Sequence, residues 1–134
     1  MLDYLLRQEL HDGAVRGLDL LLPRCGLNGS LHNYLVACQV EGKSPKTLSI
    51  YSRAISTFIQ FFHENHLPLE LKEVRGSDIR LFLLSFQQGN RTPATVHVYY
   101  RSLRTFFNWL VEEDLLRKSP MLNIRPPKLP QKVM

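Results

Sequence analysis

Residues 43–53 read KSPKTLSIYSR and open a long helical pattern. Ser44 can cap a helix, and Pro45 suits the first helical position, where no backbone N–H is needed. Apolar side chains then follow at the spacing of one helix face: Leu48, Tyr51, Ile55, Phe58, Ile59 and Phe62. The pattern predicts a helix from Ser44 to about Asn65, where an approaching proline ends it.

Thr92-Pro93 repeats this opening later in the chain. A long apolar face runs from Val96 to Val111 and predicts a helix that ends near Leu115. A separate polar stripe lies at i, i+4, i+7 and i+11 on this helix: His97, Arg101, Arg104 and Asn108.

Two shorter helices are predicted on either side of the 43–65 segment. The first covers residues 31–41, with Ser30 as its N-cap and Gly42 as its stop. The other is capped by Gly76 or Ser77 and ends within residues 87–90, which read QQGN. With no strand-like alternation between them, these segments indicate an all-α domain.

The two ends of the chain differ from the helical part. Residues 1–29 contain four glycines and a proline, so we expect an appended arm, part of which could be helical. Residues 119–134 contain four prolines and three basic residues, which is typical of a semi-rigid linker.

Composition narrows the function classes. The chain has 134 residues, 44% hydrophobic, with a net charge of +5. Eight basic and three acidic residues fall within residues 89–134, so this segment holds the whole excess. Cys25 and Cys38 form no CxxC pair, and no apolar run approaches the roughly 20 residues of a membrane span. We expect a cytoplasmic protein with reduced thiols, no membrane association and an anionic partner.

Charge runs against helix preference in both long helices. Acids favour a helix N-terminus and bases a C-terminus, by about 0.3–1 kcal/mol each. The 43–65 helix instead starts with Lys43, Lys46 and Arg53, and Glu64 lies near its end. The helix from Thr92 repeats the arrangement, with Arg91, Arg101 and Arg104 first and EED at residues 112–114 last.

This reversed polarity suggests phosphate binding. Free N–H groups at a helix start, together with nearby bases, attract phosphates, and Ser44, Thr47, Thr92 and Thr95 add hydroxyl donors. In an up-down bundle the second and fourth helices are parallel, which would put both basic starts at one end. The bland alternative is a solvated charged face, with Ser44 and Thr47 serving only the helix start.

Other candidate sites are weak. His63 and His66 lack an obvious third metal ligand, and no glycine-rich phosphate loop is present, so we expect neither metal nor cofactor. We expect Tyr51 and Tyr99 in or at the rim of the core, and Tyr100 stays open.

Three segments together resemble the N-terminal, SAM-like core-binding domain of phage integrases, which are tyrosine recombinases. They are residues 43–62, residues 92–110, and the exit from Leu116 to Lys128, with Ser119 where asparagine is usual. The resemblance covers about residues 30–130. It implies a four-helix orthogonal SAM-like bundle over residues 30–118, with the N-terminal extension before it and the Pro-rich C-terminal linker after it.

The resemblance also implies a function. Such a domain forms one half of a clamp on double-stranded DNA, in DNA integration and recombination. Carried over by position, the DNA-binding residues are Lys43, Ser44, Lys46, Thr47, Arg53, Thr92, Thr95, Arg101 and Arg104, and the charge pattern at the helix starts adds Arg91. Cleavage in the family uses a tyrosine and a His-x-x-Arg motif in a C-terminal domain. This chain has no His-x-x-Arg, so we expect binding without catalysis and a linker leading toward an absent catalytic domain.

Two further expectations follow. In the full-length family, protomers assemble on DNA largely through catalytic domains, so this chain is expected to be a monomer in isolation. The alternative function is a helical protein-protein interaction module with no DNA binding. This alternative predicts an exposed apolar groove.

Overall fold

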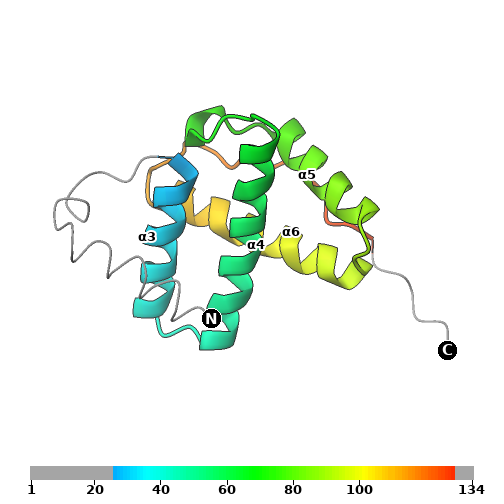
Figure 1. The fold of residues 1–134 in the computed structure, drawn as a ribbon. Coiled ribbons are helices and arrows are strands. Elements are labelled where there is room, and N and C mark those ends of the chain that lie inside the picture. Colours follow the sequence, from blue (N-terminus) through cyan, green and yellow to red (C-terminus); the bar gives the residue numbers. More distant parts are fainter. Residues whose placement is uncertain (1–25, 129–134) are drawn as a thin grey trace.

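Four α-helices and one short 3₁₀ helix make up residues 26–128, the part of the chain that this computed structural model describes (Figure 1). In chain order they are α3 (Gly26–Val40), α4 (Pro45–Glu64), η1 (Leu71–Glu73), α5 (Gly76–Gln88) and α6 (Pro93–Glu112). The described residues include no strand, which confirms the all-α prediction. Residues 1–25 of the expected arm fall outside the described residues.

The two long helices begin as predicted. The Ser44 hydroxyl accepts a hydrogen bond from the Thr47 N–H at 3.2 Å, and Thr92 does the same for Thr95 at 3.2 Å. A proline occupies the first turn of each helix. α4 ends at Glu64 with Asn65 as its C-cap, as expected, and α6 ends at Glu112, three residues before Leu115, with Glu113 as its C-cap.

The predicted start of the first helix is wrong. α3 begins at Gly26, so the expected boundary between residues 29 and 30 falls inside it, and Ser30 is a buried helix residue rather than a cap. The Leu27 N–H donates to the Leu69 carbonyl at 2.9 Å, and the Leu27 side chain is fully buried. Tertiary packing therefore extends the helix past its local cap signal.

Gly26 makes this extension possible. Its φ is +79°, in the left-handed region that glycine adopts readily, and a Cβ here would lie 3.0 Å from the Leu69 carbonyl oxygen. The predicted cap of α5 is also corrected, because the capping position is Arg75, which makes no side-chain cap hydrogen bond.

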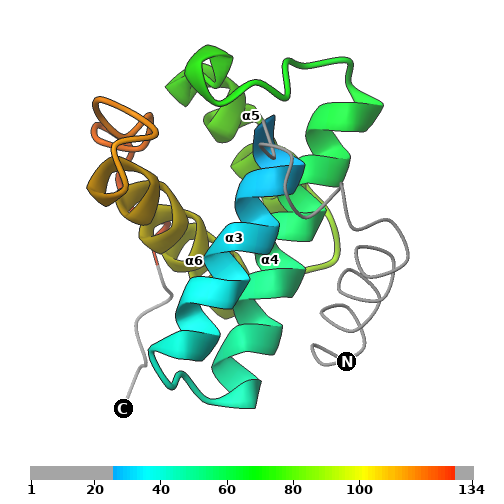
Figure 2. The same ribbon diagram turned by 90° about the vertical axis from the view of Figure 1, so that its left-hand side faces the viewer.

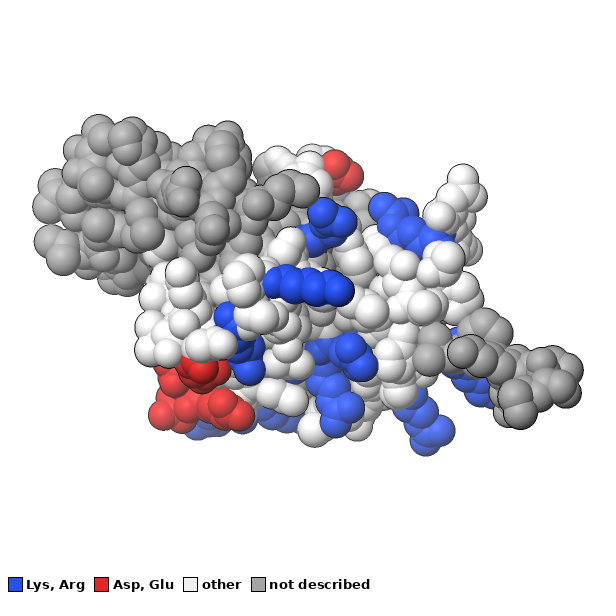
Figure 3. Space-filling view, turned by 90° about the horizontal axis from the view of Figure 1, so that it is seen from below, with Lys and Arg blue, Asp and Glu red and all other residues white. Residues whose placement is uncertain are grey.

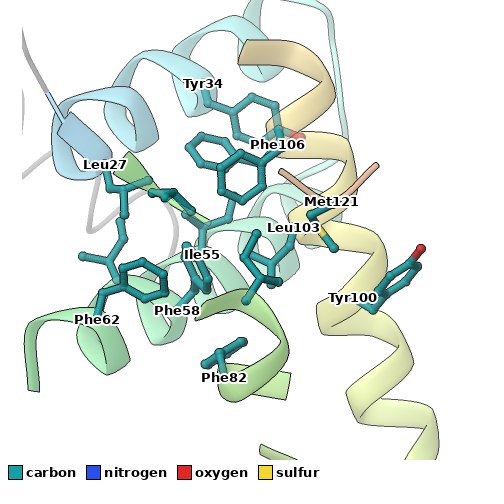
Figure 4. Packing of buried hydrophobic residues seen from close by; sticks show 14 of the residues in the cluster. Leu27, Tyr34, Ile55, Phe58, Phe62, Phe82, Tyr100, Leu103, Phe106 and Met121 are labelled. Atoms are coloured by element: carbon teal, nitrogen blue, oxygen red, sulfur yellow. The ribbon is translucent and has the colours of Figure 1, made fainter. Parts of the chain in front are cut away.

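Aromatic rings fill the core between the helices (Figure 4). The Phe58 ring lies 4.5 Å from that of Phe62 and 5.3 Å from that of Phe82, and the Tyr34 ring lies 5.2 Å from that of Phe106. Such contacts add about 0.5–1.5 kcal/mol per pair beyond simple burial. Tyr51 and Tyr99 are partly buried at the rim of the core, as predicted.

α6 crosses α4 steeply instead of running parallel to it (Figures 1 and 2). The expected up-down arrangement is therefore wrong, and the orthogonal bundle is right. The crossing follows from where the apolar faces lie: α6 packs against both α4 and α5, and its buried stripe includes Val96, Leu103 and Leu110.

The residues after α6 turn back and pack on the bundle. We call residues 119–128 the strap. Its Met121 and Ile124 are buried, and in Figure 4 Met121 lies beside Leu103. The expected linker is thus anchored to the core in its first half rather than hanging free, because two apolar residues among the prolines have an apolar surface to cover.

Candidate nucleic-acid interface

One stripe of α4 lines an open groove against α6. The groove has a volume of about 350 Å³, and the residues that line it are Lys46, Ser49, Ile50 and Arg53 of α4 and Thr95, Val98 and Tyr99 of α6. The predicted residues Lys46, Arg53 and Thr95 thus meet although the two helices are not parallel. The crossing places the first halves of both helices side by side.

The cations of this groove are free to meet a ligand. Lys46 and Arg53 are exposed, and neither makes an ion pair within residues 26–128. The first turns of α4 and α6 contain no acidic residue. The penalty expected from the helix dipole is therefore present in the fold and is not offset by a neighbouring carboxylate.

Arg101 and Arg104 extend the positive charge along α6. Both are exposed, and neither lines the groove. At 3.6 residues per turn they lie on the outward side of α6, next to the groove residue Val98. Lys43 also belongs to this surface, although its ammonium nitrogen lies 3.9 Å from a Glu41 carboxylate oxygen.

We call five residues the basic face, one just before α4 and two each on α4 and α6: Lys43, Lys46, Arg53, Arg101 and Arg104. Figure 3 looks at the molecule from the end where α4 begins. Lysine and arginine side chains spread across the middle of this view, and aspartate and glutamate stay at its margin.

The four predicted hydroxyl donors sit at the two helix starts. Ser44 and Thr47 hydroxyl oxygens lie 2.9 Å apart, and Thr92 and Thr95 repeat this pairing at 2.9 Å. Each start thus uses one hydroxyl for its cap. The paired arrangement supports the structural role foreseen for Ser44 and Thr47, and it leaves Thr95 on the groove wall.

Arg91, another predicted site residue, contacts an aromatic ring and lines a different hollow. Its guanidinium carbon sits 4.0 Å above the centre of the Phe86 ring, a cation–π contact. It lines a second hollow of about 460 Å³ between α4 and α5, together with Gln60 and Glu64. Because its guanidinium contacts the Phe86 ring and faces a hollow that Glu64 also lines, Arg91 is a weaker candidate for a phosphate contact than the groove cations.

Sequence reasoning missed several residues of the interface. Ile50 and Val98 line the groove as apolar neighbours of the cations, and the Tyr99 ring stacks on Phe86 at 4.2 Å. Tyr100, whose role was open, is buried, and its hydroxyl donates to the Ile124 carbonyl at 2.8 Å. No local pattern marks such a contact, because it joins residues 24 positions apart.

Other kinds of site find little support. In the described part of the chain, no three His, Cys, Asp or Glu side chains are grouped to hold a metal. His63 and His66 are exposed. Within the same residues, no helix is long and apolar enough to cross a membrane.

Comparison with known proteins finds one family model and one similar fold. The model described as phage integrase, N-terminal SAM-like domain, matches residues 31–116. A crystal structure of the N-terminal domain of a phage integrase/site-specific recombinase from Haloarcula marismortui is similar, with a TM-score of 0.62 and 15% identity. That similarity covers 69% of this chain and 88% of the other, and it shows the fold alone. No curated protein matches the sequence.

Proposed function

The chain belongs to the phage integrase family as its N-terminal SAM-like domain, and we propose that it binds double-stranded DNA through the basic face. The family acts in DNA integration and recombination. The role proposed for this chain is binding, since its interface offers cations and hydroxyls rather than a nucleophile with a base. Such a role would place the protein in the cytoplasm.

The observation that carries the proposal is the groove shared by α4 and α6. It brings Lys46 and Arg53 beside Thr95, with no acidic residue in its lining. Both groove cations come from the first half of α4, and Lys46 lies in its first turn, where the positive end of the helix dipole adds to its field. A run of phosphates along a nucleic-acid backbone is the ligand that fits a line of separate cations.

This arrangement favours backbone contact over base readout. Lysine and arginine held on an open surface neutralise phosphates and release counterions, which makes affinity fall with salt by about 0.9 log units per log unit for each phosphate. Base readout by Arg101 or Lys46 would add sequence preference to this electrostatic term.

The test is a titration of labelled duplex DNA, followed by fluorescence anisotropy at several salt concentrations. We expect Lys46→Ala and Arg101→Ala each to weaken binding and to reduce the salt slope by about 1. Both side chains are exposed, so unfolding free energies should change by less than about 0.5 kcal/mol.

Lys118→Ala and Arg117→Ala are the matched controls. They remove the same charges from exposed positions that line a hollow with Asp114, away from the groove. Equal losses in all four variants would mean that only net charge matters. Unchanged binding in Lys46→Ala, Arg101→Ala and their double variant would remove the basic face as the interface.

The second hollow favours one alternative, a protein-interaction module. Phe61 of α4 and Phe82 and Phe86 of α5 line it. Leu81 and Leu84 of α5 are exposed. Binding of a partner there would depend little on salt and would survive Lys46→Ala. Absence of DNA binding at low salt would favour this alternative.

A further inference from the structure

The strap runs back along α6. Figures 1 and 2 show it leaving the C-terminal end of α6 and returning toward the end where α6 begins. The hydrogen bond from the Tyr100 hydroxyl to the Ile124 carbonyl fixes its position beside the middle of α6. The residues that follow Ile124 therefore lie beside the first half of that helix.

Three further contacts hold the strap in place. The Arg80 guanidinium donates to the Asn123 carbonyl at 3.3 Å. A Cβ on Gly76 would come within 2.9 Å of the Pro120 carbonyl oxygen, so the start of α5 fits closely under the strap. The Met121 N–H donates to the Ser119 hydroxyl at 3.1 Å and shapes the turn.

Two basic side chains project from the outer part of the strap. Ile124 turns inward, with its Cδ1 about 4.0 Å from where a Gly76 Cβ would be. Arg125, the next residue, is exposed. Pro126 and Pro127 keep the backbone extended as far as Lys128, which is exposed as well.

The strap borders the basic face. Measured round the α6 axis from Tyr100, Arg104 lies at about 40°, Arg101 at about 100° and Val98 at about 160°. Tyr100 touches the strap and Val98 lines the groove, so the two arginines occupy the surface between the strap and the groove. Three neighbouring rows of cations result, one each from α4, α6 and the strap.

We propose that Arg125, together with Lys128, forms a third row of contacts to the DNA backbone, and that Tyr100 is the positioning residue that holds this row. The inference rests on the proposed function and extends it to residues beyond the helices. The bond from the buried Tyr100 hydroxyl joins Ile124, the residue next to Arg125, to α6.

The experiment measures DNA affinity and its salt slope in the full chain. We expect Arg125→Ala to weaken binding with a slope reduced by about 1, and Arg125→Ala with Lys128→Ala to reduce it by about 2. Arg117→Ala is the control with equal charge loss.

A double-mutant cycle tests the role of Tyr100. Tyr100→Phe removes only the hydroxyl, and Tyr51→Phe, a core-rim tyrosine that does not line the groove, is its control. We expect the losses from Tyr100→Phe and Arg125→Ala to overlap, so that the double variant binds about as weakly as the weaker single one. The losses from Tyr100→Phe and Lys46→Ala should multiply, because these residues act on separate rows.

Gly76→Ala displaces the strap by a second route and should reproduce the effect of Tyr100→Phe on affinity. Urea unfolding of each variant confirms that the helical core remains folded. Binding by Arg125→Ala with the parent affinity and slope, beside a weakened Lys46→Ala, would overturn this inference and leave the proposed function standing. A parent chain that does not bind DNA at low salt would overturn both.

Discussion

At the residue scale, the cations of the interface could be named from sequence, but their partners could not. Lys46, Arg53 and Thr95 were predicted from charge placed against the helix dipole, and the fold brings them to one groove. Arg91 carries the same sequence signal, yet its guanidinium lies over Phe86. Local pattern does not separate these cases, because ring stacking depends on which helix comes to lie beside the residue.

A buried pair of titratable groups gives a prediction at this scale. Burial raises the pKa of the Cys38 thiol above its ordinary 9.0 and the pKa of the Tyr34 hydroxyl above its ordinary 10.0. The folded chain therefore keeps both protons at a pH where the unfolded chain loses them. The free energy of unfolding should hold steady with respect to these groups up to about pH 9 and fall as the pH rises through 9 and 10.

Urea unfolding at pH 8 and pH 10 measures this effect. The free energy of unfolding of Tyr34→Phe should fall less between the two pH values than that of the parent chain, because this variant has lost one of the two groups. Equal falls in both proteins would mean that the Tyr34 hydroxyl contributes nothing to the pH dependence.

At the element scale, the long helices were predictable because their starts and faces agree. Each combines a hydroxyl cap, a proline in the first turn and an apolar stripe, and α4 and α6 begin as expected. The start of α3 was missed because a bond to Leu69 and the burial of Leu27 lie beyond local pattern. The charge argument assumed parallel helices and so missed the crossing of α4 and α6, although the family resemblance implied an orthogonal bundle.

The two matching caps give the second prediction. Ser44→Ala and Thr92→Ala each remove the oxygen that accepts from the N–H three residues on. Each should lower the free energy of unfolding by about 0.5–2 kcal/mol. Thr105→Ala is a suitable control, because its exposed hydroxyl bonds only to the Arg101 carbonyl within the helix. Losses no larger than in this control would show that the caps contribute little.

At the scale of the whole molecule, acidic side chains are sparse near the basic face. Within residues 26–128, Glu41 is the one acid near the start of α4, and the other seven lie at the end of α4, in residues 70–78 or at the end of α6. The basic face should therefore meet DNA, and the ends of α4 and α6 should point away from it.

Glu41 offers a test of this orientation. Its carboxylate lies 3.9 Å from the Lys43 ammonium, so Glu41→Gln removes a repulsive charge and frees a cation. We expect DNA affinity to rise by the equivalent of a surface ion pair, about 0.2–1 kcal/mol or roughly 1.5- to 5-fold. Glu113→Gln, an equal change at the end of α6, should leave the DNA affinity measured by anisotropy unchanged. Equal gains in DNA affinity in both variants would mean that the chain has no preferred orientation on DNA.

The bond between Tyr100 and Ile124 also sets the tether length for anything attached after the strap. A free flexible segment of about 16 residues would let its far end wander by about 20 Å. The bond to Tyr100 instead holds the strap against α6 at Ile124. A module attached there would be confined to a small volume beside the interface, and its effective concentration at the same stretch of duplex would rise accordingly.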